Sequence, residues 1–209
     1  MVALKRLDDA IRDGDNIRAV IRNSGANSDG RTTGIMLPSQ AAQGRLAQSL
    51  FRNLSFTPLD VQYAEAHGTG TKAGDEVEIG AIRDVFCHDH RSGNPIFVGA
   101  TKPNIGHSEA ASGVAGLIKT VMAMEKGMIP PNILLENFKP GLKPDEQTLK
   151  VSLPRELLSL FDLHPMLIMI LRTGLKVINT MAVHGLQPKS CSEQLWLRGN
   201  KRHGCPRIC

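Results

Sequence analysis

A strand-like apolar run that ends in a histidine-bearing glycine loop occurs twice in this chain. Residues 59–65, LDVQYAE, alternate apolar and polar side chains as a half-buried strand does, and His67 follows in the loop HGTGT. Residues 95–102, PIFVGATK, predict a buried strand, and His107 follows in KPNIGH. Each loop leads into a stretch with helical spacing of its apolar residues. Alternating strands and helices are typical of α/β folds, in which the ends of the strands usually carry function. The sequence therefore predicts an α/β domain with a histidine at the end of each of two strands.

Further strands and helices are expected in the first 152 residues. Residues 2–7 and 17–25 predict strands, and Ser39 is placed to cap a helix that follows it. Residues 74–86 and 108–127 predict two more helices. In the second of these we expect one apolar face to be turned inward, formed by Val114, Leu117, Ile118, Val121 and Met122.

Composition and charge narrow the class of protein. With 209 residues, 41% of them apolar, the chain is long enough to bury one sizeable core. The net charge of +5 lies entirely in residues 153–209, which hold eight Lys or Arg against three Asp or Glu; residues 1–152 hold 17 of each kind. Aromatic residues make up only 4%, too few for base-stacking surfaces, so we expect no nucleic-acid partner.

The sequence also lacks signals for a membrane or an oxidising compartment. Its longest apolar run, MLIMIL at 166–171, is far shorter than the roughly 18 residues that a membrane span needs. The first residues have no apolar core of a signal peptide, and the four cysteines show no regular spacing. We therefore expect a cytoplasmic protein with no membrane partner.

Four stretches around the two histidines carry a family resemblance by their order and spacing. They are YAEAHGTGT (63–71), GDEVEIGAI (74–82), VGATKPNIGHSEAASGVAGLIK (98–119) and MEKGMIPPNI (124–133). Together they resemble the C-terminal half of the β-ketoacyl synthase domain of type I polyketide synthases. The preceding residues 2–35 are similar to the corresponding stretch of fungal reducing, iterative synthases. The resemblance covers about residues 2–151 and implies the C-terminal half of a thiolase-like layered α/β fold.

The resemblance also implies a reaction, decarboxylative Claisen condensation. A cysteine accepts an acyl chain, a malonyl group on the phosphopantetheine of an acyl carrier protein loses CO₂, and the resulting carbanion attacks the thioester. Negative charge develops on the thioester oxygen, so two neutral imidazole N–H groups that converge on it lower the barrier. The resemblance assigns this role to His67 and His107. Their ring nitrogens are then expected within roughly 6 Å of each other, or about 10 Å in a partly formed site.

Further residues of the two loops receive roles from the resemblance. Lys102 is expected to fix charge and geometry near the site, and Thr69 and Thr71 to contact the pantetheine arm. A solvated surface lysine, and threonines that only stabilise their own turn, are the alternatives that the sequence leaves open. Four residues are expected to shape the loops: Gly68, Gly70, Asn104 and Gly106.

The family's partners follow from the same resemblance. They are an acyl carrier protein, the N-terminal half of the ketosynthase, and a second copy in a homodimer. No tightly bound cofactor is expected, because the substrate is carried on phosphopantetheine.

Some positions depart from the family. Lys72 and Glu76 stand where the family usually has proline, which loosens the loop after HGTGT. Asp75 remains, and with Glu78 three residues later it has the spacing of a capping box at the start of the predicted helix.

None of the cysteines matches the family's nucleophile, which belongs to a segment N-terminal to the motifs found here. Cys87 lies at a helix end where the family does not use cysteine, so we expect the isolated chain to be inactive in condensation. His88 and His90 next to it predict a charged surface turn, since no second pair has metal-ligand spacing. The other cysteines and a nearby histidine lack zinc-site spacing as well: Cys191, Cys205, His203 and Cys209. No metal site is expected.

Residues 153–209 depart from the family altogether. Where the family continues into a Phe-Gly-x-Gly-Gly-Thr-Asn stretch, this chain has INTMAVHG at 178–185. The codons of Met181–His184, read one base earlier, can spell Tyr-Gly-Gly-Thr. We therefore expect an irregular, poorly packed tail that comes from a shifted reading frame or a retained intron. A binding module for carrier protein or synthase subunits, and a product of a decayed gene, are the alternatives to a piece of an enzyme.

Overall fold

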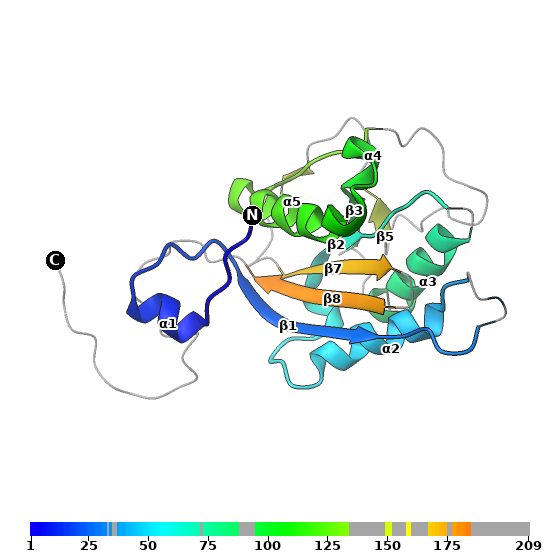
Figure 1. Ribbon diagram of the computed structural model, residues 1–209, viewed down its shortest axis with the longest axis horizontal. Helices are drawn as coiled ribbons and strands as arrows, with labels where there is room; N and C mark the ends of the chain where they lie inside the picture. Colours follow the sequence, from blue (N-terminus) through cyan, green and yellow to red (C-terminus); the bar gives the residue numbers. More distant parts are fainter. Residues whose placement is uncertain are drawn as a thin grey trace.

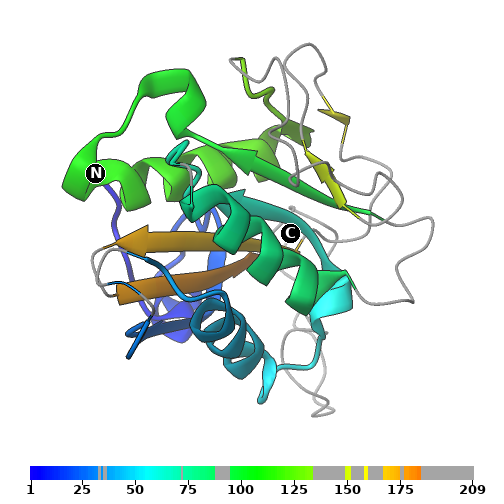
Figure 2. The same cartoon turned by 90° about the vertical axis from the view of Figure 1, so that its right-hand side faces the viewer.

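The centre of the molecule is a mixed six-stranded sheet. The structure, a computed structural model, describes residues 1–32, 34, 37–71, 73–87 and 95–133, and the backbone of four later strands. The sheet has the order β1-β8-β7-β2-β3-β5. Its strands are β1 (Val20–Asn27), β2 (Val61–Ala66), β3 (Ile96–Ala100), β5 (Leu149–Val151), β7 (Leu167–Gly174) and β8 (Val177–His184). A short antiparallel pair, β4 (Met128–Ile129) with β6 (Leu158–Ser159), lies outside it. Helices cover both faces, so the predicted layered α/β fold is confirmed (Figures 1 and 2).

The strands that precede the two histidines are neighbours. β2 and β3 run parallel, with Tyr63 opposite Phe97 and Ala66 opposite Ala100. Because both strands end at the same level, the loops that follow them start side by side at one edge of the sheet.

One face of the sheet is covered by α2 (Gln40–Phe51) and α3 (Gly74–Phe86), which also pack on each other (Figure 2). The hydroxyl of Ser39 accepts the Ala42 N–H and caps α2, as predicted. The apolar residues of both helices and of the sheet form one buried cluster, which includes Leu50, Phe51, Val61, Ile82, Val85, Phe86 and Ile96. This cluster anchors α3 against β2, the strand that directly precedes His67.

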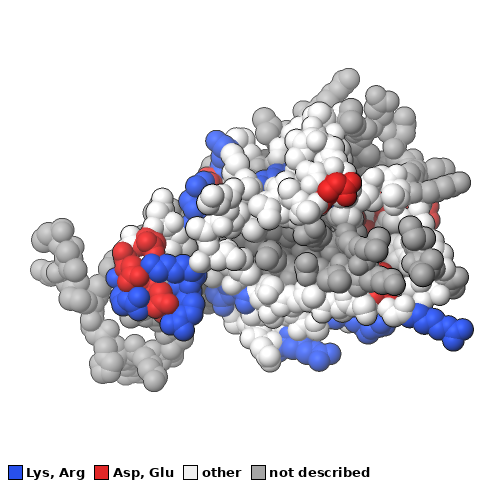
Figure 3. Space-filling model, viewed as in Figure 1, with Lys and Arg blue, Asp and Glu red and all other residues white. Residues whose placement is uncertain are grey.

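The other face is covered by α5 (Ser112–Lys126), which ends at Gly127 with φ +60° (Figure 1). Leu117 and Met124 pack with Tyr63 in a second cluster. Val114, Ile118 and Met122 are 43%, 37% and 45% exposed, so the expectation that they point inward is wrong. α5 is apolar on more than one face, and spacing alone does not say which face meets the sheet. In Figure 3 the surface over α5 is mostly uncharged.

The N-terminal residues differ from the prediction. No strand forms at 2–7; instead α1 (Leu7–Arg12) follows, in which Asp9 pairs with Arg6 at 2.8 Å and with Arg12 at 2.7 Å. These pairs stand three residues apart, a spacing that favours a helix and that the apolar pattern does not register. The strand expected at 17–25 is present as β1, shifted to Val20–Asn27.

The segment after residue 152 contributes strands. β7 and β8 form an antiparallel hairpin, β7 pairs parallel with β2, and β8 pairs antiparallel with β1. An irregular tail therefore does not describe residues 167–174 and 177–184. Their many β-branched and apolar residues favour extended backbone, which the lack of family motifs concealed. In the part of the chain that the structure describes, no helix is long and apolar enough to cross a membrane.

The packing of the two helical faces predicts a contrast between two isoleucines. Ile82 on α3 is fully buried, whereas Ile118 on α5 is 37% exposed. We expect Ile82→Ala to lower the free energy of unfolding by about 2–5 kcal/mol, because it opens a cavity in the core. Ile118→Ala is expected to change it by less than about 0.5 kcal/mol. Urea unfolding of the full chain measures both; equal losses would contradict this account of the core.

Candidate functional site

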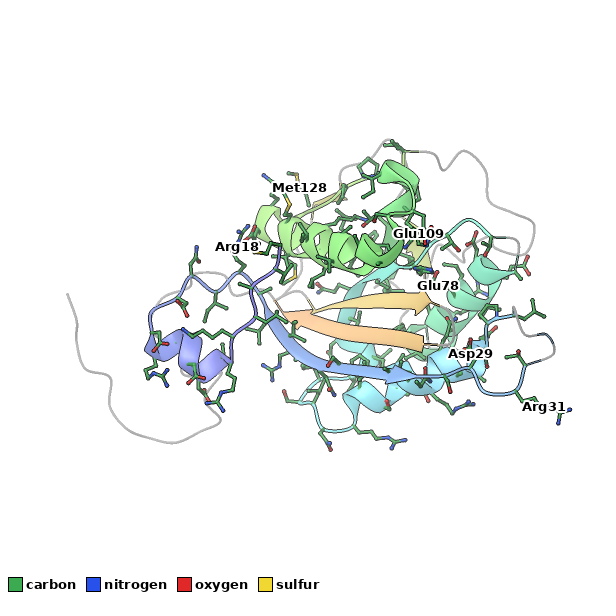
Figure 4. The ribbon with its side chains drawn as sticks, in the orientation of Figure 1. Arg18, Asp29, Arg31, Glu78, Glu109 and Met128 are labelled. Carbon is green, nitrogen blue, oxygen red and sulfur yellow. The ribbon has the colours of Figure 1, made fainter. Side chains whose placement is uncertain are left out.

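The two histidine rings meet at the edge of the sheet. The ring centroids of His67 and His107 lie 5.6 Å apart, with the ring planes at 89° to each other. His67 is half-buried and His107 is exposed. The expected convergence of the two loops, 40 residues apart in sequence, is confirmed. Glu78 and Glu109, which contact these loops, lie at this same end of the sheet (Figure 4).

A buried carboxylate holds the backbone of the first loop. Glu78, on α3, accepts the N–H of His67 at 2.6 Å and the N–H of Gly68 at 2.9 Å. Asp75 accepts the N–H of Gly70 at 3.1 Å. The N-cap of α3 is Ala73, and no side chain caps it. The predicted capping box is therefore wrong, because both acids reach back to the histidine loop rather than to the end of their own helix.

Lys102 holds the same loop from the other side. It begins the short helix α4 (Lys102–Ile105), and its Nζ donates to the carbonyl oxygen of His67 at 2.5 Å and lies 2.9 Å from Nδ1 of the same residue. Lys102 is half-buried. The alternative of a solvated surface lysine thus does not describe its surroundings.

The hydrogen bonds at Nδ1 select a tautomer for each histidine. The Lys102 ammonium group donates to Nδ1 of His67, and the backbone N–H of Glu109 donates to Nδ1 of His107 at 2.9 Å. A neutral imidazole whose Nδ1 accepts carries its proton on Nε2. Glu109 has φ +46°, a left-handed conformation that is rare outside glycine and that turns its N–H back toward His107. Both rings are therefore arranged to present an Nε2–H donor.

All three of the predicted loop glycines have a positive φ, a backbone conformation that favours glycine. Gly68 has φ +53°, and a Cβ there would lie 2.6 Å from the Cβ of Ala100 at the end of β3. Gly106, with φ +79°, ends α4 directly before His107. Gly70 also has positive φ, at +74°. The first of these glycines lets the two strand ends approach, which brings their histidines together.

The two threonines of the first loop lie next to each other. The Oγ1 atoms of Thr69 and Thr71 are 3.4 Å apart, and that of Thr71 accepts the N–H of Gly74 at the start of α3 at 3.2 Å. These contacts agree with a role for Thr71 in stabilising the turn. A contact of either hydroxyl with pantetheine stays a prediction.

Two asparagines tie the second loop to the segment after α5. Asn104 donates to the carbonyl oxygen of Pro131 at 2.9 Å and accepts the N–H of Ile133 at 3.1 Å. The buried Asn132 accepts the N–H of Ala100 at 3.1 Å. Sequence reasoning used the PPNI stretch only as part of the resemblance. Its polar Asn between apolar neighbours was the signal for a buried contact.

Cys87 lies away from the histidines. It caps the C-terminal end of α3 and packs against the buried cluster of that face. At 1.5 Å per residue, it lies about 13 Å along the helix from Glu78, which contacts the His67 loop. His88, His90, Cys191, His203, Cys205 and Cys209 lie outside the described residues.

The burial of Glu78 predicts a pH-dependent stability. Burial raises its carboxyl pKa from 4.5 to about 7, against the lowering effect of the Gly68 and His67 N–H groups and of Lys102. Between these two pH values the folded chain holds more protons than the unfolded chain, so this group makes stability fall as pH rises. Relative to Glu78→Gln, the native chain is expected to lose up to about 3 kcal/mol between pH 4.5 and 7.5.

Denaturant unfolding of both proteins across this pH range measures the difference. All histidines and other acids are common to the two chains, so their titrations cancel in the subtraction. A native-minus-variant difference that stays constant with pH would show that Glu78 titrates normally.

Comparison with known proteins identifies the family to which this chain belongs. Residues 18–136 match the model of the β-ketoacyl synthase, C-terminal domain. The chain is 51% identical over 151 residues to the highly reducing polyketide synthase cla2 of Cladosporium cladosporioides, and 50% identical over 151 residues to the highly reducing polyketide synthase ZEA2 of Gibberella zeae. Each match covers 72% of this chain and 6% of the relative, so the chain spans a small part of the length of these synthases.

Solved structures of bacterial ketosynthases share the fold. The ketosynthase from module 6 of the bacillaene synthase of Bacillus subtilis 168 has a TM-score of 0.78 and 33% identity, covering 88% of this chain and 33% of that one. The oxazolomycin ketosynthase domain OzmH KS7 of Streptomyces albus JA3453 has a TM-score of 0.81 and 29% identity, covering 89% and 33%. With a family match over more than half of its length and this thiolase-like fold, the chain belongs to the β-ketoacyl synthase family, as a C-terminal ketosynthase domain of the reducing polyketide synthase type.

Proposed function

We propose that His67 and His107 bind the thioester oxygen of a malonyl group during decarboxylative Claisen condensation. The observation that carries this proposal is the pair of rings 5.6 Å apart, each with its Nδ1 engaged by a donor. Two Nε2–H groups can then converge on one oxygen without adding a net charge. Preorganised donors of this kind stabilise an oxyanion more than water does, because they need no reorientation as charge develops.

The reaction follows from that stabilisation. The bond between the malonyl α-carbon and its carboxylate breaks, CO₂ leaves, and the electron pair delocalises onto the thioester oxygen held by the histidines. The carbanion then attacks the carbonyl carbon of an acyl group on a cysteine, and the cysteine thiolate is released. We propose that the N-terminal half of the ketosynthase supplies this cysteine, since Cys87 packs against the core at the far end of α3. The 209 residues alone are then inactive in condensation.

Lys102 acts on His67 rather than on the substrate in this proposal. Its ammonium group lies 2.9 Å from Nδ1 and fixes the ring's tautomer. Thr69, which is half-buried, and Thr71, which is exposed, stand two and four residues beyond His67, and we propose that they contact the pantetheine arm that brings malonyl to the histidines. The substrate is thus supplied by an acyl carrier protein, and no tightly bound cofactor is needed.

The exposed apolar stripe of α5, formed by Val114, Ile118 and Met122, suggests where the rest of a ketosynthase packs. These residues stand four apart and so share one side of the helix. The solved ketosynthases are about three times as long as the part that this chain covers. We propose that the N-terminal half of the ketosynthase covers this stripe, and that the complete domain forms the family's homodimer.

Residues beyond about 152 are proposed to be read in a shifted frame. The proposal is supported by the sequence alone: similarity to the cla2 synthase covers 72% of the chain, and INTMAVHG at 178–185 stands where the family that this chain resembles continues into Phe-Gly-x-Gly-Gly-Thr-Asn. The nucleotide sequence tests this proposal, and transcripts that support an intact frame would refute it.

A chimaeric synthase tests the role of the histidines. The 151 matching residues of the cla2 synthase are replaced by those of this chain, and ketide formation and CO₂ release from malonyl thioester are measured. We expect the chimaera to be active. His67→Ala or His107→Ala is expected to lower turnover about 10²- to 10³-fold, the usual loss for one oxyanion donor.

The matched control is Cys87→Ser, which removes the described thiol while leaving both histidines in place. Its turnover is expected to equal that of the unmodified chimaera. Full activity of both histidine variants would rule out the proposed function.

The stripe on α5 gives a second expectation in the same chimaera. Ile118→Lys places a charge where we propose that the N-terminal half packs, so it is expected to abolish ketide formation. In the isolated chain the same change leaves the lysine in water and is expected to alter the free energy of unfolding by less than about 0.5 kcal/mol. Comparable destabilisation of chimaera and isolated chain would contradict the proposed interface.

A further inference from the structure

A buried polar network lies beneath the two histidine loops, on the α5 side of the sheet. At its centre is the carboxylate of Glu65, which is 2% exposed. Its Oε2 accepts from the hydroxyl of Tyr63 at 2.6 Å and from Nζ of Lys119 at 2.8 Å, and its Oε1 accepts from the hydroxyl of Thr101 at 2.5 Å. Lys119 also donates to the Tyr63 oxygen at 2.9 Å. The carboxylate is thus bonded to β2, to α5 and to the residue that follows β3.

The network is desolvated, and its bonds are mutually dependent. Tyr63 is fully buried, and the side chain of Lys119 is only 12% exposed. Burial and the neighbouring Glu65 raise the pKa of the Tyr63 hydroxyl well above its usual value, which keeps it a donor. Loss of one partner would leave a buried charge without compensation, so the members stabilise one arrangement rather than several.

The backbone makes room for this network. A Cβ at Gly99 would lie 2.3 Å from the Tyr63 hydroxyl oxygen, so only glycine allows the phenol to lie across β3. A Cβ at Gly116 on α5 would already lie 3.4 Å from Cγ of Glu65. Both neighbouring elements approach closely around the carboxylate.

The hydrogen bonds of Glu65 are linked to those of His67 through Thr101 and Lys102. Glu65 stands two residues before His67, and Thr101 stands directly before Lys102. Lys102 in turn bonds to the carbonyl oxygen and Nδ1 of His67. The path from Glu65 to Thr101, Lys102 and His67 therefore ends in the loop that directly follows β2, the strand of Glu65. A shift of Thr101 relative to Glu65 would change where Nζ of Lys102 meets the imidazole.

We propose that Glu65, with Tyr63, Lys119 and Thr101, is a positioning network that sets the contact between Lys102 and His67. Through that contact it sets which nitrogen of His67 carries the proton. The functional meaning of this positioning rests on the proposed role of His67 as an oxyanion donor. None of the four residues is required to touch the substrate.

The test is made on the full chain without substrate, by measuring the ¹⁵N chemical shifts of the His67 ring, which report the ratio of its two neutral tautomers. Thr101→Val removes the hydroxyl at nearly constant volume, and Thr101→Ser is the conservative control that keeps it. We expect Thr101→Val to change the tautomer ratio about 2- to 10-fold, the equilibrium equivalent of one net hydrogen bond. Thr101→Ser is expected to leave the ratio as in the native chain.

Glu65→Gln extends the test to the centre of the network and is expected to change the ratio at least as much. Ile82→Val is the matched destabilised control, because it weakens the core on the opposite face of the sheet. If Thr101→Val and Glu65→Gln lower stability but leave the ratio unchanged, as Ile82→Val should, the network is only structural and the proposal fails. An equal change in Thr101→Ser and Thr101→Val would also overturn it. If Glu65→Gln does not fold, the threonine pair decides.

Failure of the proposed function can be distinguished from failure of this inference. The tautomer measurement needs no turnover, whereas the histidine variants of the chimaera report turnover alone. Active histidine variants together with a coupled tautomer ratio would refute the oxyanion role and leave the positioning network in place.

Discussion

The peptide group after His67 is held between the carboxyl group of Glu78 and the ammonium group of Lys102, and the arrangement of the site depends on this clamp. The carboxylate of Glu78 accepts the N–H groups of His67 and Gly68, while the ammonium group of Lys102 donates to the carbonyl oxygen of His67. The two groups come from elements that follow β2 and β3, so the clamp fixes α3 and α4 relative to one strand end. The carboxyl group of Glu78 contacts only the loop backbone, whereas Lys102 contacts both the backbone and Nδ1 of the imidazole, which orients the ring.

Parallel pairing of β2 with β3 makes this clamp possible. The strands end at the same level, and Gly68 lets its loop pass next to Ala100 without a side chain between them. On the α3 side of the sheet, Glu78 is buried. On the α5 side, a second acid, Glu65, is buried and pairs with Lys119. Two acids on opposite faces thus support one loop. His107 and the apolar stripe of α5 remain exposed.

The meeting of the two histidines was an expectation from the family resemblance, and the structure gives its reason, since β2 and β3 are neighbours. The sequence itself predicted the α/β fold class, because strand alternation up to Ala66 and the buried run up to Ala100 identified two strands with a histidine just past each of them. It did not reveal the roles of Glu78 and Glu65, since a polar residue in a strand or on a helix has the same spacing whether it faces water or a partner. Periodicity also assigned the wrong buried face to α5, because the apolar residues of this helix occupy more of its circumference than the sheet can cover. The strands after residue 152 were not predicted, because this segment lacks the family's motifs. Its apolar and β-branched residues nevertheless favour extended backbone, and they form the hairpin of β7 and β8.

The short span of chain that builds the site has a consequence for the order of folding. β2, α3, β3, α4 and α5 are consecutive, and every contact described around the histidines joins residues between 63 and 133. None of these contacts needs a residue beyond 133, so they can close before the later strands have been synthesised. During synthesis at about 5–20 residues per second, this unit is complete several seconds before β7 and β8 can enter the sheet. We therefore expect the two histidine loops to be assembled on a nascent chain in which β7 has not yet paired with the free edge of β2.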